Sequence, residues 1–345
     1  MNERLPSSRW VGALAWVAAL AVLCGACNDQ TEEGESSASV NIVPMELGAS
    51  DPILPLPTEP PNLDSRKVAL GERLFSDPIV SPNNDVACVT CHQLARGGVD
   101  GRAFSTLPGN QAPPFHTPTV FNLVYNFRCH WEGSFGELTE QLAAPVQNPR
   151  ILGTTFDAIV QRLSKSVEYR DAFDEIFDDG ITVATVKDTF VQFERSLITP
   201  NARFDRYLYG DTKALTAEEL EGYRLFGSYG CVSCHQGINI GGNMYQQLGV
   251  MRDYFSEKET LTDADNGRYN VTHREEDRHI FRVPSLRNVA VTAPYLHDGS
   301  AKTLEEVVRI MGRYQLGREL DEADVHLIVA FLRTLTGEYK GRKLQ

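Results

Sequence analysis

Two cysteines separated by two residues and followed at once by a histidine occur twice in this chain of 345 residues. The pattern spans residues 88–92 and 231–235, and both copies continue with glutamine. Thiols at this spacing can add to the two vinyl groups of one haem while the histidine reaches its iron. The sequence therefore predicts two covalently bound c-type haems. The six residues that would hold them are Cys88, Cys91 and His92 for the first, and Cys231, Cys234 and His235 for the second.

The first 27 residues are typical of an export signal. Arg4 and Arg9 give it a positive start, and the apolar stretch 10–23 is too short for a confident membrane-spanning helix. Small residues then precede Cys27, in a pattern that resembles a bacterial lipoprotein signal. We expect residues 1–27 to be a signal peptide of the lipoprotein type, with export to the periplasm and a lipid anchor at Cys27. Plain cleavage after a small residue is the alternative.

Composition limits the partners of the mature chain. The formal net charge of -13 argues against nucleic acid and fits a basic protein partner. Of the seven cysteines, two lie in the leader, four lie in the haem motifs, and Cys129 is left over. This assignment leaves no disulfide framework.

Apolar residues recur at the spacing of an α-helix in three stretches, 156–163, 183–197 and 328–335. Thr216 and Glu219 form a capping box that begins another helix. No alternating run is long enough to predict a sheet. The predicted fold class is therefore mostly α.

The chain also repeats itself. Gly-Glu-Arg-Leu-Phe at 71–75 precedes the first haem motif, and Gly-Tyr-Arg-Leu-Phe at 222–226 precedes the second. Downstream, the segments 118–122 and 284–288, which begin with proline and end with asparagine, correspond to each other. Such a repeat predicts two similar cytochrome c-like domains with one haem each.

The boundary between the two domains should lie before the capped helix, near residues 201–211. The predicted organisation comprises the signal peptide 1–27, a flexible linker at 28–62 rich in Ser, Glu, Gly and Pro, an N-terminal haem domain at 63–205 and a C-terminal haem domain at 206–345.

The repeat predicts different ligands for the two irons. Met311 lies 27 residues after Pro284, and its thioether is the best candidate for the second iron. The position 27 residues after Pro118 is Pro145, which cannot ligate a metal. We therefore predict a second haem closed by Met311 and a first haem open on its distal side. A core methionine is the alternative interpretation of Met311.

Trp131 occupies the repeat position of His297. Its polarisable indole could carry electrons between the two haems, whereas a buried core tryptophan is the alternative.

Ordered motifs across residues 62–340 resemble the bacterial dihaem cytochrome c peroxidase family. They are CVTCH, TPTVFN, WEGS, PVQNP, FERSLITPN, YGCVSCHQG, GGNMYQ, VPSLRNV, TAPYLHDGS and IMGRYQLG. The resemblance implies reduction of hydrogen peroxide at the N-terminal haem, with electrons that enter at the C-terminal haem from a small cytochrome c or cupredoxin. It also implies Met311 as distal ligand, Trp131 between the haems, His297 close to the first haem, and a tendency to form homodimers. A MauG-like oxidase that acts on a partner protein and a non-enzymatic electron-transfer protein are the alternatives.

The distal pocket of the first haem departs from this family. The family's distal histidine falls on Pro108, and its distal glutamate falls on Ile151, which cannot move a proton. Gln141 keeps the position of the family's distal glutamine. His130, directly before Trp131, could supply the missing base or bind the iron, or it could simply pack.

The resemblance further implies a calcium ion between the domains. Two of its carbonyl ligands would fall on Thr292 and Pro294, but the family's asparagine ligand is replaced by His116. His116 could instead face the distal pocket.

Overall fold

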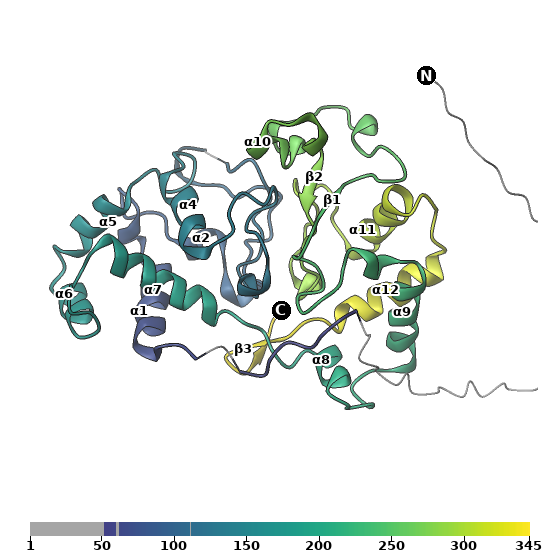
Figure 1. Cartoon of the computed structure of the whole chain (residues 1–345), viewed down its shortest axis with the longest axis horizontal. Coiled ribbons are helices and arrows are strands. Elements are labelled where there is room, and N and C mark those ends of the chain that lie inside the picture. Colours follow the sequence, from purple (N-terminus) through teal and green to yellow (C-terminus); the bar gives the residue numbers. More distant parts are fainter. Residues whose placement is uncertain (1–51, 60–61, 111) are drawn as a thin grey trace, which may run out of the picture. The chain divides into compact units, whose positions relative to one another are not determined.

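The structure, a computed structural model, describes residues 52–59, 62–110 and 112–345. Helices make up most of its regular structure, and each of the two sheets in this part of the chain has two short strands (Figure 1). The predicted fold class, mostly α, is confirmed. The predicted signal peptide, including Cys27, lies outside the described residues. No helix of the described part is long and apolar enough to cross a membrane.

The α-helices are α1 Ser65–Ser76, α2 Cys88–Cys91, α3 Leu138–Gln141, α4 Ala143–Gln147, α5 Phe156–Leu163, α6 Val167–Asp174, α7 Val183–Ser196, α8 Arg203–Leu208, α9 Ala217–Ser228, α10 Tyr269–Thr272, α11 Leu304–Ile310 and α12 Glu322–Arg333. Short 3-10 turns are η1 Pro78–Val80, η2 Leu94–Arg96, η3 Pro108–Asn110, η4 Leu123–Tyr125, η5 Cys231–Ser233, η6 Phe255–Glu257, η7 Asp263–Asn266, η8 Glu275–Asp277 and η9 Val289–Val291, and η10 Met311–Gln315 is a π-helical turn. Strand β1 Tyr245–Gln247 pairs antiparallel with β2 Ile280–Arg282, and β3 Glu338–Tyr339 pairs antiparallel with β4 Arg342–Lys343.

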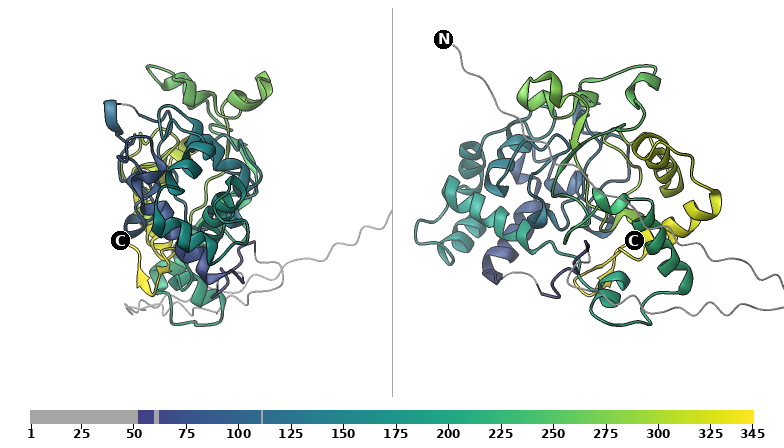
Figure 2. Two further views of the ribbon diagram at one scale, coloured as in Figure 1. Left: turned by 90° about the vertical axis from the view of Figure 1, so that its left-hand side faces the viewer. Right: turned by 45° about the vertical axis from the view of Figure 1, so that its right-hand side comes forward.

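One pair of packed helices forms the base of each predicted domain: α1 lies against α7, and α9 lies against α12 (Figure 1, Figure 2). A glycine in the first helix of each pair brings the two backbones together. A Cβ atom added to Gly71 would overlap the carbonyl oxygen of Thr189, and one added to Gly222 would overlap that of Leu327. These glycines begin the two repeated segments found in the sequence, so the repeat encodes the same helix crossing twice.

Aromatic packing repeats in the same way. The rings of Phe75 and Phe193 lie 5.2 Å apart between α1 and α7, and those of Phe226 and Phe331 lie 5.2 Å apart between α9 and α12. Each phenylalanine of the first helix also faces the histidine of the haem motif that follows it. The helix pairs therefore position the two motifs alike.

The Gly222→Ala variant should be destabilised by about 1–3 kcal/mol, because the new methyl group forces α9 away from α12. Gly227→Ala is the matched control on the same helix, since nothing lies within 4 Å of its added Cβ. That control should gain about 0.5–1 kcal/mol from the better helix propensity of alanine. Urea unfolding of both variants checks the prediction, and equal stability of the two would contradict it.

Buried polar residues join the two halves at the ends of the repeated segments. Asn122 and Asn288 both have left-handed backbones, with φ of 59° and 62°. Their amide nitrogens both donate to the hydroxyl of Thr199, over 2.8 and 2.9 Å. The side-chain oxygen Oδ1 of Asn122 accepts from the backbone nitrogen of Thr199, and Oδ1 of Asn288 accepts from that of Gly337. The repeat is thus visible in the hydrogen bonds as well as in the helices.

The start of the described chain packs on the second domain, although its composition suggested a flexible linker. Ile53 and Leu56 are each only 1% exposed, and Ile53 belongs to the core of the second domain. The backbone nitrogen of Leu56 bonds to the carboxylate of Asp205, which forms a buried ion pair with Arg287 at 2.8 Å. Arg287 also donates to the carbonyl of Leu54. Residues 52–56 are therefore part of the folded body.

The end of the chain packs on the first domain in turn. Leu344 is buried in the first core, and the ring of Tyr339 lies 5.0 Å from that of Phe121. Lys340 in the β3–β4 turn pairs with Glu72 of α1 at 2.5 Å. The two hydrophobic cores therefore do not correspond to two continuous segments divided near residue 205.

Candidate functional site

The first haem motif sits on one short helix. Cys88 and Cys91 begin and end α2, and His92 follows directly. Nδ1 of His92 lies 3.2 Å from the carbonyl oxygen of Gly98, and the backbone of Pro118 also faces the ring. Burial lowers the pKa of His92, so the ring is neutral. A neutral imidazole oriented by backbone carbonyl groups is a typical metal ligand.

The second motif has matching surroundings. The ring centroids of His235 and Phe226 lie 6.5 Å apart, with an angle of 49° between the ring planes. For His92 and Phe75 the same two values are 6.4 Å and 45°. Burial lowers the pKa of His235 to about 4. Its buried Nδ1 makes no hydrogen bond within the described chain, although the carbonyl group of Pro284 faces the ring. This neighbouring carbonyl group is placed to orient the ring, as the partners of a metal-binding histidine do.

The cysteines fit covalent haem as well. Burial raises the pKa of Cys88 to about 12 and that of Cys231 to about 11, so both are neutral thiols. They pack beside the two apolar cores without being fully covered themselves. Neutral thiols beside an apolar wall fit the thioether links of a c-type haem. The residues present at both motifs therefore fit the cofactor that the sequence predicts.

The two sites differ on the predicted distal side. Met311 begins the π-helical turn η10 directly after α11, and its side chain packs on the same core as Cys231. Turns of this kind are frequent at functional sites. Pro145 lies in α4 and offers the first site no donor atom. Ligation by Met311 and an open first haem remain predictions that this arrangement supports.

His130 faces the first site. Its positive charge would lower the pKa of His92, so the two rings lie near one another. Its side chain bonds to Gln141, and its backbone oxygen accepts a hydrogen bond from Arg282 over 2.9 Å. Burial lowers the pKa of His130, which keeps the imidazole neutral and able to accept a proton. The structure thus brings together two of the residues predicted for this pocket.

Gln141 leads to a residue that the sequence reasoning missed. Its amide nitrogen lies 3.1 and 3.0 Å from the two carboxyl oxygens of Glu194 on α7. Glu194 is 4% exposed, and burial raises its pKa to about 8. A signal was available, because Glu194 follows Phe190 by four residues and precedes Leu197 by three, which places a charged residue on the apolar stripe of the helix.

Trp131 belongs to the first half of the chain but packs against the core of the second. Its indole nitrogen donates to the backbone oxygen of His116 over 2.8 Å, and the backbone nitrogen of His116 donates to His297 over 2.8 Å. The backbone oxygen of Trp131 accepts from Arg282. The indole is therefore held rigidly where the two halves meet, as a bridge between the sites requires.

Comparison with known proteins identifies the family. A profile described as di-haem cytochrome c peroxidase matches residues 65–213. Cytochrome c peroxidase Ccp of Escherichia coli (strain K12) is 40% identical over 328 residues, which cover 94% of this chain and 67% of that protein. Cytochrome c551 peroxidase of Nitrosomonas europaea is 41% identical over 300 residues, which cover 86% of this chain and 88% of that protein. The chain belongs to the di-haem cytochrome c peroxidase family.

A solved structure agrees with this assignment. A MauG-like protein associated with microbial copper homeostasis superposes with a TM-score of 0.73 at 26% identity, over 85% of this chain and 95% of that one. The resemblance noted in the sequence is thereby confirmed, and two haems per chain follow from the family.

The catalytic role of His297 stays a prediction, and the structure shows the partners of its side chain. Its ring is 2% exposed, and Nε2 lies 2.8 Å from Asp265. Lys258 lies 2.5 Å from Asp265 and 2.8 Å from Asp298. Burial alone would raise the pKa of Asp265, but hydrogen bonds from His297 and Lys258 lower it. His297 therefore belongs to a polar cluster with Asp265, Lys258 and Asp298.

The calcium site expected from the family does not fit the residues present. His116 is 3% exposed, and its Nδ1 lies 2.8 Å from the carbonyl oxygen of Arg102. Burial lowers the pKa of His116, while carbonyl groups that include that of Thr292 oppose this shift. Calcium requires six to eight oxygen ligands. With His116 in place of the family's asparagine, the site lacks one side-chain oxygen ligand. The His116 ring also faces the carbonyl group of Thr292, which was expected to bind the ion. We therefore assign no role to calcium or to Pro294.

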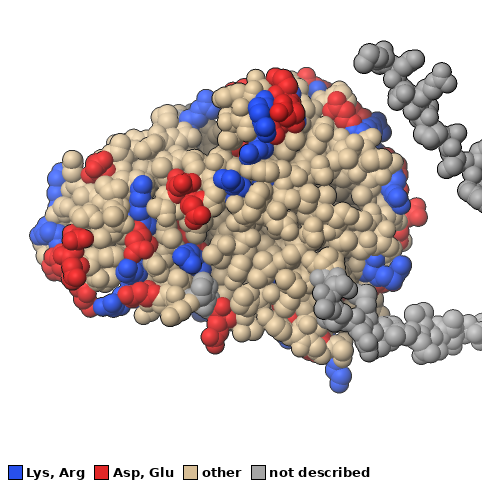
Figure 3. All heavy atoms as spheres, viewed as in Figure 1, with Lys and Arg blue, Asp and Glu red and all other residues tan. Residues whose placement is uncertain are grey.

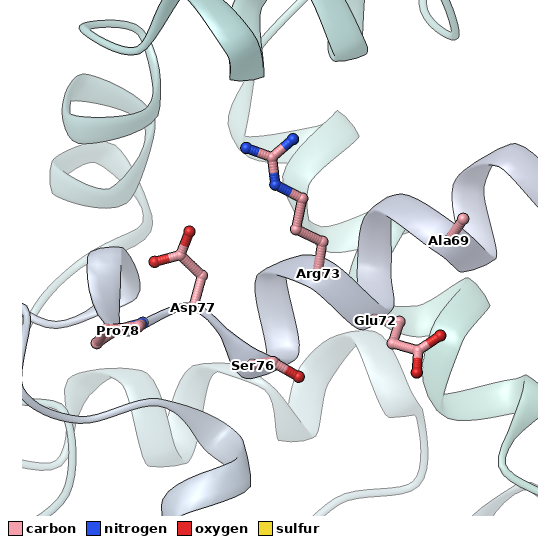
Figure 4. Close-up of a pocket in the computed structure, with 6 residues that line it drawn as sticks. All are labelled: Ala69, Glu72, Arg73, Ser76, Asp77 and Pro78. Atoms are coloured by element: carbon pink, nitrogen blue, oxygen red, sulfur yellow. The ribbon is translucent and has the colours of Figure 1, made fainter.

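The surface depression drawn in Figure 4 is unrelated to the haem sites. It lies on the outer face of α1 and is lined by Ala69, Glu72, Arg73, Ser76, Asp77 and Pro78. Its charged groups have structural partners, since Arg73 pairs with Glu168 and Asp77 accepts from Tyr169. We give this depression no function.

Proposed function

We propose that this chain is a cytochrome c peroxidase that reduces hydrogen peroxide to water at its first haem. Electrons would enter at the second haem from a small cytochrome c or cupredoxin. The observation that carries the proposal is the asymmetry of two otherwise matched sites. Met311 packs on the core that also contacts Cys231, whereas Pro145 has the corresponding repeat position in the first half, where His130 and Gln141 lie near each other.

The residues of the first site would manage the proton. When bound, the haem would supply an iron with a free coordination position. The neutral imidazole of His130 would accept a proton from one peroxide oxygen and return it to the other, a role that Ile151 cannot perform. Gln141 would orient the imidazole through their hydrogen bond.

Trp131 would provide the path between the sites, since it packs on the second core and is anchored by His116 and Arg282. The matches to peroxidases at 40% and 41% identity favour this function over a MauG-like oxidase, because the MauG-like structure is 26% identical.

The surface charge supports a protein donor. On the face shown in Figure 3, acidic and basic side chains are interspersed around a central area without charged groups. The basic stripe that binds nucleic acid is absent from that face. Together with the net charge of -13, this favours a basic electron donor.

For location we propose export to the periplasm and a lipid anchor at Cys27, supported by the sequence of residues 1–27. A homodimer is proposed from the family resemblance. Membrane fractionation of Cys27→Ser tests the anchor, and sedimentation of the mature protein tests the dimer.

Purified mature holoprotein should consume peroxide while it oxidises reduced cytochrome c. His130→Ala should lower kcat/KM for peroxide about 10²–10⁴-fold, the usual contribution of an acid–base group. His326→Ala is the matched control, because that ring is exposed and pairs with Glu218. Absence of any donor oxidation would sink the peroxidase function in favour of electron transfer. A His130→Ala variant with full activity would remove His130 from the mechanism only.

A further inference from the structure

Glu194 is a buried acid that the proposed proton transfer does not yet use. It is 4% exposed, and none of the ion pairs found in the described part of the chain includes it. Its hydrogen-bond partner is the amide of Gln141, which is itself 7% exposed. An acid buried without a cation costs stability, so its retention here requires an explanation.

The position of Glu194 relates it to the first haem site. Its charge is felt by the thiols of Cys88 and Cys129, so it lies near the haem motif and near the loop that carries His130. Gln141 contacts both Glu194 and His130. Glu194, Gln141 and His130 therefore form one connected row of side chains beside the site.

An amide between an acid and an imidazole can adopt two orientations, and the hydrogen-bond network decides between them. When Glu194 is a carboxylate, it accepts from the Gln141 NH₂ group. The Gln141 oxygen is then left to accept an N–H from His130, so the other ring nitrogen of His130 carries a lone pair. In the structure the NH₂ group of Gln141 points to the Glu194 carboxyl group, as this arrangement requires.

When Glu194 is protonated, its O–H donates to the Gln141 oxygen instead. The amide then turns, and its NH₂ group faces the imidazole. The ring nitrogen of His130 that faces Gln141 must now accept a hydrogen bond, so the other ring nitrogen carries the proton. The same imidazole is thereby changed from a proton acceptor to a proton donor.

We propose that the protonation state of Glu194 sets the orientation of the Gln141 amide and, through it, whether the other ring nitrogen of His130 accepts or donates a proton. Glu194 is thus a positioning residue, and this assignment rests on the proposed peroxidase function.

Other titratable groups near Glu194 do not reproduce this effect. The Cys88 thiol becomes a thioether when haem is attached, and burial raises the pKa of Cys129 to about 11, so neither ionises near neutral pH. His130 is the remaining titratable neighbour. The charged groups of α1 that could approach α7 are paired elsewhere, in the ion pairs Lys67–Asp188, Glu72–Lys340 and Arg73–Glu168, and Arg162 of α5 bonds to the carbonyls of Ile79 and Val80.

Infrared spectroscopy of the ferric holoprotein tests the titration directly. The wild type should show the C=O stretch of a protonated carboxylic acid at pH 6, and the band should vanish as the pH passes about 8. Glu194→Gln should lack this band, whereas Thr189→Val should keep it. Thr189 is a matched control because it is buried on the same helix and its hydroxyl bonds only to Thr185.

The pH profile tests the coupling to His130. Burial raises the pKa of Glu194, so the proton-accepting form of His130 gains population with rising pH and saturates above about pH 8. We expect kcat/KM for peroxide to rise about tenfold per pH unit between pH 6 and 8 in the wild type and in Thr189→Val. In Glu194→Gln this slope should be lost.

Each outcome separates the two proposals. If the infrared band titrates but the protein does not consume peroxide, the titration of Glu194 is supported and the peroxidase function is overturned. An active Glu194→Gln variant with the wild-type pH slope would overturn the role of Glu194 and leave the peroxidase intact. Absence of the infrared difference between wild type and Glu194→Gln would also overturn it.

Discussion

Replacing Arg287 by alanine is expected to destabilise the folded protein by about 3–5 kcal/mol, the cost of leaving a buried charge without its partner. Arg287 and Asp205 are 2% and 1% exposed, and their ion pair is bidentate at 2.8 and 2.9 Å. Burial raises the pKa of Asp205 even though Arg287 opposes this shift. Without the arginine, Asp205 must stay charged in an apolar site or take up a proton, and Leu54 loses a hydrogen bond.

Urea unfolding measures this loss. Arg224→Ala is the control, because its ion pair with Glu221 is exposed and should leave the unfolding free energy nearly unchanged. The double replacement Arg287→Met with Asp205→Leu should recover much of the loss, since a buried pair exchanged for apolar groups is often neutral. A single Arg287→Ala variant as stable as the wild type would show that the pair does not hold residues 52–56.

Met311→Ala is expected to lower the reduction potential of the second haem, because a thioether ligand raises it. Each fall of about 59 mV makes reduction by a given donor tenfold less favourable. Turnover with reduced cytochrome c should fall accordingly, while direct reaction of peroxide with the first site should persist.

A potentiometric titration with optical detection checks this effect. Met251→Ala is the matched control, since Met251 is 65% exposed and its backbone bonds to Tyr314 in the turn that begins with Met311. An unchanged potential in Met311→Ala would mean that another group binds the second iron.

Local patterns predicted the helices well. The apolar stretch 156–163 is α5 in the structure, and 183–197 corresponds to α7 with one residue beyond its end. The capping box at Thr216 and Glu219 is present at the start of α9. These features depend on neighbours three or four residues apart, so the sequence contains all that is needed to find them.

Features that depend on distant partners could not be found in this way. Residues 52–56 resemble a linker in composition, and their burial depends on Arg287, more than 200 residues away. A role for His297 near the first haem was implied by the family motif, and its bond to Asp265 could not be foreseen from spacing. Glu194 was missed because a single acid on an apolar stripe gains meaning only from Gln141 beside it.

The exchanged ends of the chain have a consequence for biogenesis. Leu344 is part of the first core, so that core cannot be completed before the end of the chain has been made. The second core combines Ile53 with residues as far along the chain as Leu335. Neither core can therefore be complete before both CxxCH segments have been synthesised, and both segments are available for haem attachment before the protein closes around them.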